Sequence, residues 1–185
     1  MKKTKRSNRK PTPGPLPSFW GHLHLVPSFC SLFSCLSAFM PLFLLSGSLG
    51  SGQLLSSDKV LFGGEQSFLV DGVYYSYSLN LNIGLLIGLQ CFALSALAFF
   101  LSKGSIKLSA IGIGLALVGE ILFACGPLLL NLSSPSLVLS DIHFGPGAGL
   151  LVFFGGLGIL VGGLYLAKLI VQKARKNKMD DLKKR

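Results

Sequence analysis

The chain has 185 residues, of which 50% are hydrophobic and only 13% are charged. Soluble domains carry about 25% charged residues, so this composition excludes an ordinary water-soluble core and is typical of a membrane protein. Basic residues outnumber acidic ones by 17 to 7, and they gather near the two ends and in one short connection. This is the positive-inside pattern of a membrane protein, and it does not indicate a nucleic-acid surface.

Residues 1–28 form a basic and then proline-rich tail, which we expect to be extended and cytoplasmic. The uncharged apolar run at residues 29–49 predicts a first membrane span, although serines and Pro41 interrupt it. A cleaved signal peptide, with small residues at Ser46, Gly47 and Ser48, is the alternative interpretation. The sequence leaves both interpretations open.

Residues 50–80 form the longest connection, and their acidic residues indicate that it faces outward. Asp71-Gly72 lies between β-rich flanks, which is typical of a hairpin turn. From Val73 to Asn80 two sets of side chains alternate with a period of two, as in a half-exposed strand. We therefore expect a small β-hairpin-like element in this first extracellular loop.

Two further apolar runs, residues 81–101 and 108–130, predict the second and third spans, since about 20 residues of helix cover the hydrocarbon thickness of a bilayer. The joint at residues 102–107 permits only an antiparallel return. Counted from this joint, Gln90 and Glu120 lie at matching depth near the middle of the membrane. Glu120 is the only carboxylate inside a long apolar run.

An ionised carboxylate at that depth costs about 2.5 to 3.5 kcal/mol on insertion scales. We therefore expect Glu120 to be largely neutral and to form a hydrogen bond with Gln90, whose amide offers a donor and an acceptor, or with a backbone carbonyl. The pair forms either a structural lock between two helices or a proton or cation site. The residue pattern leaves both hypotheses open.

Small residues recur at helical spacing in the later spans, where they let helix backbones approach closely. In the fourth predicted span, residues 147–171, small pairs recur every seven residues and form two adjacent seams. The predicted helix-packing residues are Gly84, Gly88, Gly112, Gly119, Gly155, Gly156, Gly158, Gly162 and Gly163.

The remaining segments complete the predicted topology. Gly126-Pro127 predicts a kink in the outer part of the third span, and residues 131–146 form the second outer loop. Residues 172–185 form a basic cytoplasmic tail. We expect this tail to attract anionic inner-leaflet lipids with about 1 kcal/mol for each basic residue near the surface.

These segments predict an all-α membrane protein, with a four-transmembrane-helix bundle at residues 29–171 and a β-hairpin-like element in the first extracellular loop. We expect a multi-pass protein of the plasma membrane with both termini in the cytoplasm. The layout resembles the topology of claudins and related tetraspan proteins. The claudin loop signature, a Trp followed by a Cys pair, is absent from residues 50–80, so no residue role is carried over.

The sequence contains no HExxH, no GxSxG, no P-loop and no aspartate pair within its apolar runs, so we expect no enzymatic activity, no metal and no cofactor. The first functional hypothesis is a structural, accessory or partner-binding membrane protein, whose outer loop or glycine seams bind a second copy or another membrane protein. The alternative is a small oligomeric transporter or channel that uses the pair Glu120 and Gln90.

Overall fold

The computed structural model describes residues 22–46 and 52–184. The predicted tail up to residue 21 and the candidate cleavage site around Gly47 therefore lie outside the described residues. In chain order the elements are α1 (Leu25–Ser37), β1 (Phe43–Leu45), β2 (Gln53–Leu55), α2 (Ser57–Phe62), β3 (Gly64–Val70), β4 (Val73–Leu79), α3 (Ile83–Leu101), α4 (Ile106–Ala124), α5 (Gly126–Ser133), the 3-10 turn η2 (Leu139–Asp141), β5 (Ile142–Phe144) and α6 (Pro146–Lys184).

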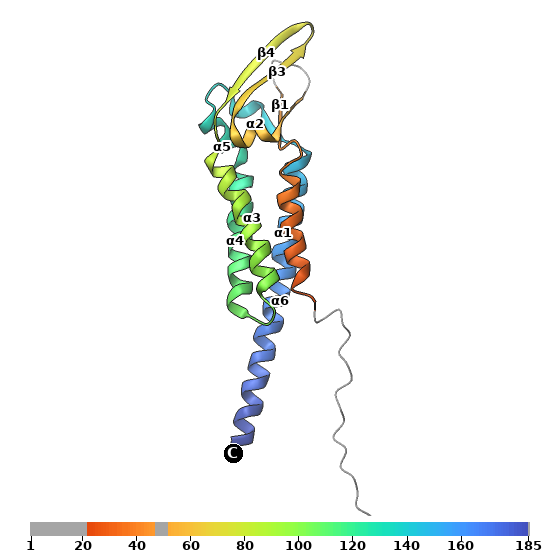
Figure 1. The fold of residues 1–185 in the computed structure, drawn as a ribbon, viewed down its shortest axis with the longest axis vertical. Coiled ribbons are helices and arrows are strands. Elements are labelled where there is room, and N and C mark those ends of the chain that lie inside the picture. Colours follow the sequence, from red (N-terminus) through yellow and green to blue (C-terminus); the bar gives the residue numbers. More distant parts are fainter. Residues whose placement is uncertain (1–21, 47–51, 185) are drawn as a thin grey trace, which may run out of the picture.

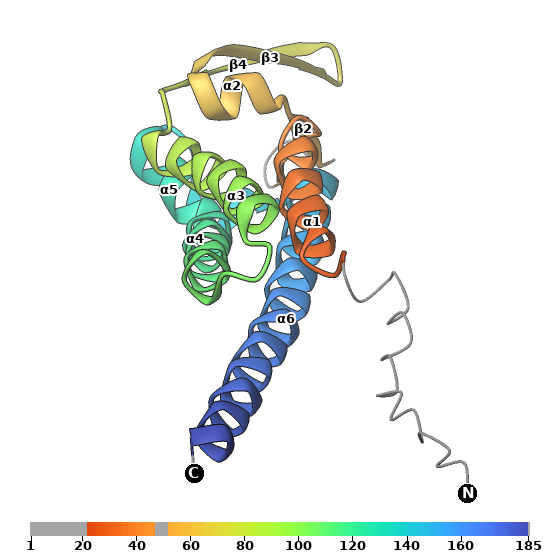
Figure 2. The same ribbon diagram turned by 60° about the horizontal axis from the view of Figure 1, so that its bottom comes forward.

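Three helices, α3, α4 and α6, are long and apolar enough to cross a membrane. Between 28% and 33% of their most apolar windows is buried inside the protein, so most of that apolar surface faces outward, as in helices that contact lipid. α3 packs on α4, α4 on α6, α6 on α1, and α1 on α3 (Figures 1 and 2). The protein is thus mostly helical, with its strands gathered at one end.

The prediction of a helix throughout residues 29–49 is wrong between Ser37 and Ser46, the last described residue of this stretch. α1 ends at Ser37, which gives a helix of about 20 Å at 1.5 Å per residue, shorter than a bilayer core. Pro41 follows, and proline lacks the backbone N–H that a helix interior needs. The apolar residues beyond it form strand β1 instead.

The predicted third span is divided at its predicted kink. α4 ends at Ala124, and a separate helix α5 begins at Gly126 with Pro127 in its first turn, where the missing N–H costs no helical bond. Gly126 also lets the ring of Phe43 approach, because a methyl group at this glycine would lie 2.5 Å from the Phe43 Cζ atom. The break thus seats strand β1 on the end of the helices.

A three-stranded antiparallel sheet joins the two predicted loops, with the strand order β2-β1-β5. Phe43 of β1 lies opposite Leu55 of β2 on one side and opposite Phe144 of β5 on the other. About 100 residues of chain separate β1 from β5, so the sheet ties distant segments together at the end of α6.

Strands β3 and β4 form a separate antiparallel pair, in which Gly64 lies opposite Leu79 and Val70 opposite Val73. The residues between the strands are Asp71 and Gly72, with φ angles of 49° and 80°. These left-handed conformations suit a two-residue hairpin turn. The pair projects away from the helices at what we call the hairpin end of the protein (Figure 1).

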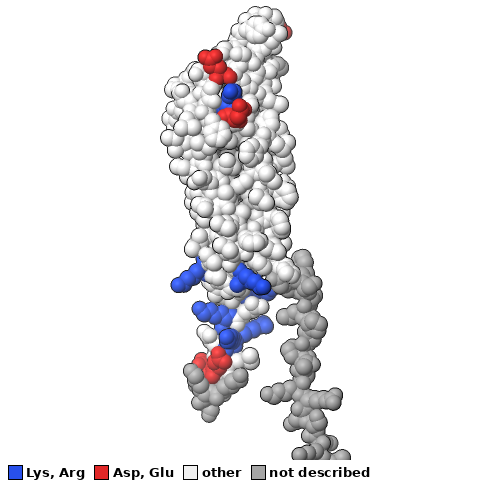
Figure 3. All heavy atoms as spheres, in the orientation of Figure 1, with Lys and Arg blue, Asp and Glu red and all other residues white. Residues whose placement is uncertain are grey.

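Helix α6 is a single helix of 39 residues, about 58 Å long at 1.5 Å per residue. It therefore includes the predicted fourth span and continues through most of the predicted tail, beyond the other helices (Figure 1). Lysine and arginine gather at this basic end, whereas the few charges at the hairpin end are mostly acidic (Figure 3). The described basic residues at the basic end are Lys103, Lys107, Lys168, Lys173, Arg175, Lys176 and Lys178.

Candidate functional site

Glu120 lies on the face of α4 that packs against α6. Its Oε1 atom is buried and has no hydrogen-bond partner among the described residues. The backbone of Gly156 faces the same carboxyl group without completing a bond to Oε1. A methyl group at Gly155 would lie 1.8 Å from Oε1 and 2.9 Å from the Phe92 ring. The carboxyl group therefore occupies the space that a side chain at position 155 would need.

Gln90 lies elsewhere, exposed on α3. It lines a shallow apolar groove with Ile83, Leu86, Ile87 and Leu89, and no hydrogen bond joins it to Glu120 within the described ranges. The predicted hydrogen bond between these two residues is therefore wrong. Two residues at the same depth in the membrane do not necessarily face each other. The direction of each side chain depends on its position around the helix, which changes by 100° per residue.

Aromatic rings fill the glycine positions between the helices. The ring of Phe123 lies against Gly88, that of Phe92 against Gly119, and that of Phe99 against Gly112 and Gly162. At each of these glycines a methyl group would come within 3.2 Å of a ring atom. Glycine here makes room for a phenylalanine of the neighbouring helix, which packs the interior closely. Gly84 is similarly covered, by the side chain of Leu129.

The two seams of α6 have different surroundings. The inner seam, which consists of Ala148, Gly155 and Gly162, is buried against the neighbouring helices. Gly158 adds a second buried contact, because a methyl group there would lie 3.2 Å from Cys30 Cβ on α1.

What we call the open seam consists of Gly149, Gly156 and Gly163, one residue further along the helix. A methyl group at any of the three would meet no described atom within 4 Å. Large exposed side chains flank this seam, among them Leu160 and Leu164, each 69% exposed. The open seam is thus a row of three glycines with free space beside each Cα, next to bulky exposed apolar residues.

A serine network that the sequence did not reveal crosses three helices. Ser31 on α1 and Ser95 on α3 share a hydrogen bond of 3.2 Å, and the Ser95 hydroxyl donates to the Gly112 carbonyl on α4 at 2.8 Å. Ser28 donates to the carbonyl of Ala96 at 2.8 Å. The serines that made the first predicted span look less apolar therefore attach α1 to its neighbours.

No protein-family model matches this chain, and neither the curated proteins nor the solved structures contain a match.

Proposed function

We propose that this protein is a non-enzymatic, multi-pass protein of the plasma membrane that acts as an accessory or partner-binding subunit. Three apolar helices support insertion into a membrane. The basic end supports a cytoplasmic location for both termini, because positive residues are retained on that side. The basic residues beyond α3, α4 and the apolar part of α6 support an attraction to anionic inner-leaflet lipids.

We count α1 as a fourth crossing, which completes a four-transmembrane-helix bundle. It packs beside α3 and α6, as the other helices pack beside one another. Backbone carbonyl groups beyond α1 are satisfied by hydrogen bonds. The Leu42 carbonyl accepts a hydrogen bond from the Gly145 N–H at 2.8 Å, and the Pro41 carbonyl accepts one from the Gly147 N–H at 2.9 Å. Non-helical backbone is tolerated at membrane depth when protein covers it in this way.

The open seam of α6 is the observation that carries partner binding. Helices associate in lipid through close backbone packing at small residues, because lipid tails are as apolar as leucine and supply no hydrophobic driving force. The inner seam packs in this way inside the bundle, where side chains of neighbouring helices occupy the space beside Gly155 and Gly162. The open seam repeats the same spacing, and no described atom lies where a side chain of its glycines would extend. We assign this space to a transmembrane helix of a second copy or of another membrane protein.

A site-specific photo-crosslinker tests this proposal in native membranes. Placed at Leu160 beside the open seam, it should capture a partner, whereas the same probe at Leu97, 52% exposed on α3, should not. Gly156→Ile should abolish the capture by filling the seam. Equal labelling at both positions, or labelling that survives Gly156→Ile, would contradict partner binding at the open seam.

Transport is the second candidate, because the Oε1 atom of Glu120 is buried and without a partner in the described structure. The ring of Phe92 lies beside it, and the buried rings of Phe99 and Phe123 also fill the interior, which favours the accessory role. Proton or cation flux into liposomes decides between the two. Transport requires flux that Glu120→Gln abolishes, and the accessory role predicts no flux in either protein.

A further inference from the structure

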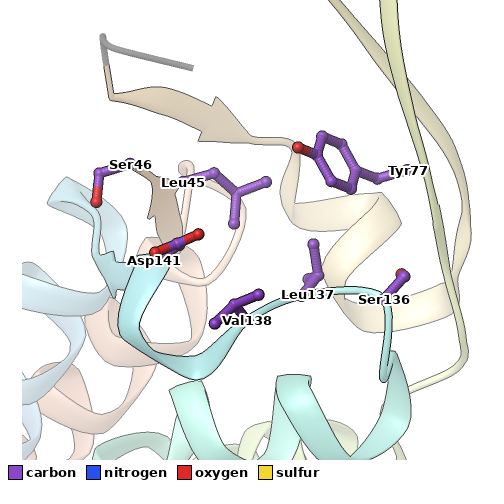
Figure 4. A pocket seen from close by; sticks show the side chains of 7 residues that line it. All are labelled: Leu45, Ser46, Tyr77, Ser136, Leu137, Val138 and Asp141. Carbon is purple, nitrogen blue, oxygen red and sulfur yellow. The ribbon is translucent and has the colours of Figure 1, made fainter. Parts of the chain in front are cut away.

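A cavity of about 210 Å³ lies at the hairpin end, between strand β1, strand β4 and the connection from α5 to β5 (Figure 4). The two sides of the cavity are joined by a backbone hydrogen bond of 2.8 Å from the Ser46 N–H to the Asp141 carbonyl. Leu45 and Leu137, both buried, form its apolar wall. The polar side chains that line it are Ser46, Tyr77, Ser136 and Asp141.

These polar groups have hydrogen-bonding capacity that the described residues leave unused. The Asp141 carboxylate accepts one hydrogen bond, from the Ser140 hydroxyl at 3.1 Å, and forms no ion pair with a basic residue in the described ranges. The Tyr77 hydroxyl points to the cavity and has no hydrogen-bond partner among the described residues (Figure 4). One carboxylate and three hydroxyl groups therefore line one partly open cavity.

We propose that this cavity binds a small molecule that carries a primary ammonium group. An ammonium has three N–H donors and no acceptor, which matches a lining that offers a carboxylate and hydroxyl oxygens as acceptors. The bond to Asp141 would be charge-assisted and so among the stronger hydrogen bonds. The volume is below the roughly 300–1,000 Å³ of pockets for drug-sized ligands, so the ligand is small. Acidic residues prevail at the hairpin end, which also favours a cation.

The ammonium has two natural sources, a soluble amine and the headgroup of an aminophospholipid. Ethanolamine serves as the probe because it is the group common to both. The full-length protein is reconstituted in phosphatidylcholine nanodiscs and titrated calorimetrically with ethanolamine. Ethylene glycol, which has the same size but no charge, is the matched control ligand.

We expect saturable binding of ethanolamine and none of ethylene glycol. Asp141→Asn should weaken binding by about tenfold or more, as expected for the loss of a hydrogen bond to a charged group. Asp71→Asn makes the same charge change at the hairpin turn, outside the cavity, and should leave binding unchanged. Tyr77→Phe keeps the ring and should weaken binding by about threefold, which provides a second test if Asp141→Asn does not fold.

Nanodiscs that contain phosphatidylethanolamine identify the source. If the headgroup occupies the cavity, they lower the apparent affinity for soluble ethanolamine; if the ligand is soluble, the affinity is the same in both membranes. Three results overturn the proposal: no saturable binding, equal binding of ethylene glycol, or equal losses in Asp141→Asn and Asp71→Asn. The last result would mean that only the general negative charge of the hairpin end attracts the amine.

Discussion

The Oε1 atom of Glu120 lies 1.8 Å from the position that a β-carbon on Gly155 would occupy. The carboxyl group of Glu120 on α4 therefore occupies space that is free only because α6 has a glycine at position 155. Glu120 fits because position 155 has no side chain, and α4 and α6 pack closely because the carboxyl group fills the gap.

Gly155→Ala should destabilise the protein by about 1 to 3 kcal/mol, the usual cost of overpacking a closely packed interior. Gly156→Ala is the matched control, because the adjacent methyl group meets no described atom within 4 Å. The free energy of unfolding in mixed micelles measures both. Adding Glu120→Ala to Gly155→Ala should recover part of the loss, since the pair is in contact. Strictly additive losses would contradict this coupling.

Ser95→Ala should weaken the attachment of α3 to both neighbours. It removes the hydroxyl that bonds Ser31 at 3.2 Å and the Gly112 carbonyl at 2.8 Å. Hydrogen bonds between membrane helices average about 0.6 kcal/mol and reach about 1.7 kcal/mol, so a loss in this range is expected in the same unfolding assay. Ser78→Ala in the exposed strand β4 should have no effect, and a neutral Ser95→Ala would show that the network adds no stability.

The hydroxyl of Tyr165 ties α6 to the short connection between α3 and α4. It accepts from the Gly104 N–H at 3.0 Å and lies 3.4 Å from the Ser102 carbonyl, to which it donates. Tyr165→Phe keeps the buried ring and should speed hydrogen exchange of the Gly104 amide, with a stability loss of about 1 kcal/mol. Unchanged exchange at Gly104 would mean that the connection holds its shape without α6.

Asp58 in helix α2 has a pKa below its ordinary value, because the Ser56 hydroxyl donates a hydrogen bond to its carboxylate. Because the pKa is lowered in the folded state, the ionised Asp58 carboxylate stabilises the fold. This stabilisation is complete above the ordinary pKa of 3.8 and is lost as the pH falls below it. Ser56→Ala should return the pKa of Asp58 towards 3.8, as followed by carboxyl NMR. Since Asp58 is exposed, the change in overall stability should be small. A titration curve identical in both proteins would exclude the hydrogen bond.

The strongly periodic parts of the fold were predictable from the sequence. The predicted second span, residues 81–101, agrees closely with α3, and the predicted break at Gly126-Pro127 is where α4 gives way to α5. The end of α1 was missed because apolar composition alone does not distinguish a helix from strand β1. The sheet order β2-β1-β5 was also missed, since it pairs residues about 100 positions apart and leaves no local pattern.

The candidate site was predictable in its residues but not in their contacts. Glu120 and the glycine pairs of α6 stand out by composition and spacing. Gln90, one of the two predicted partners of Glu120, was wrong because depth along α3 says nothing about the direction of its side chain, which is exposed. Which seam of α6 is filled depends on the rotation of that helix against α1 and α4, and only the packed structure fixes this rotation.

The most direct test of partner binding at the open seam is a mass measurement. The protein is extracted in native-membrane nanodiscs, and the mass of the protein particle in them is determined. Gly114 on α4 provides the matched control, because a methyl group there also meets nothing within 4 Å. We predict that the wild-type protein and Gly114→Ile form a particle larger than one chain, and that Gly156→Ile and Gly163→Ile reduce it to the mass of a single chain. A wild-type particle of one chain, or a complex that both α6 variants leave intact, would contradict the proposal.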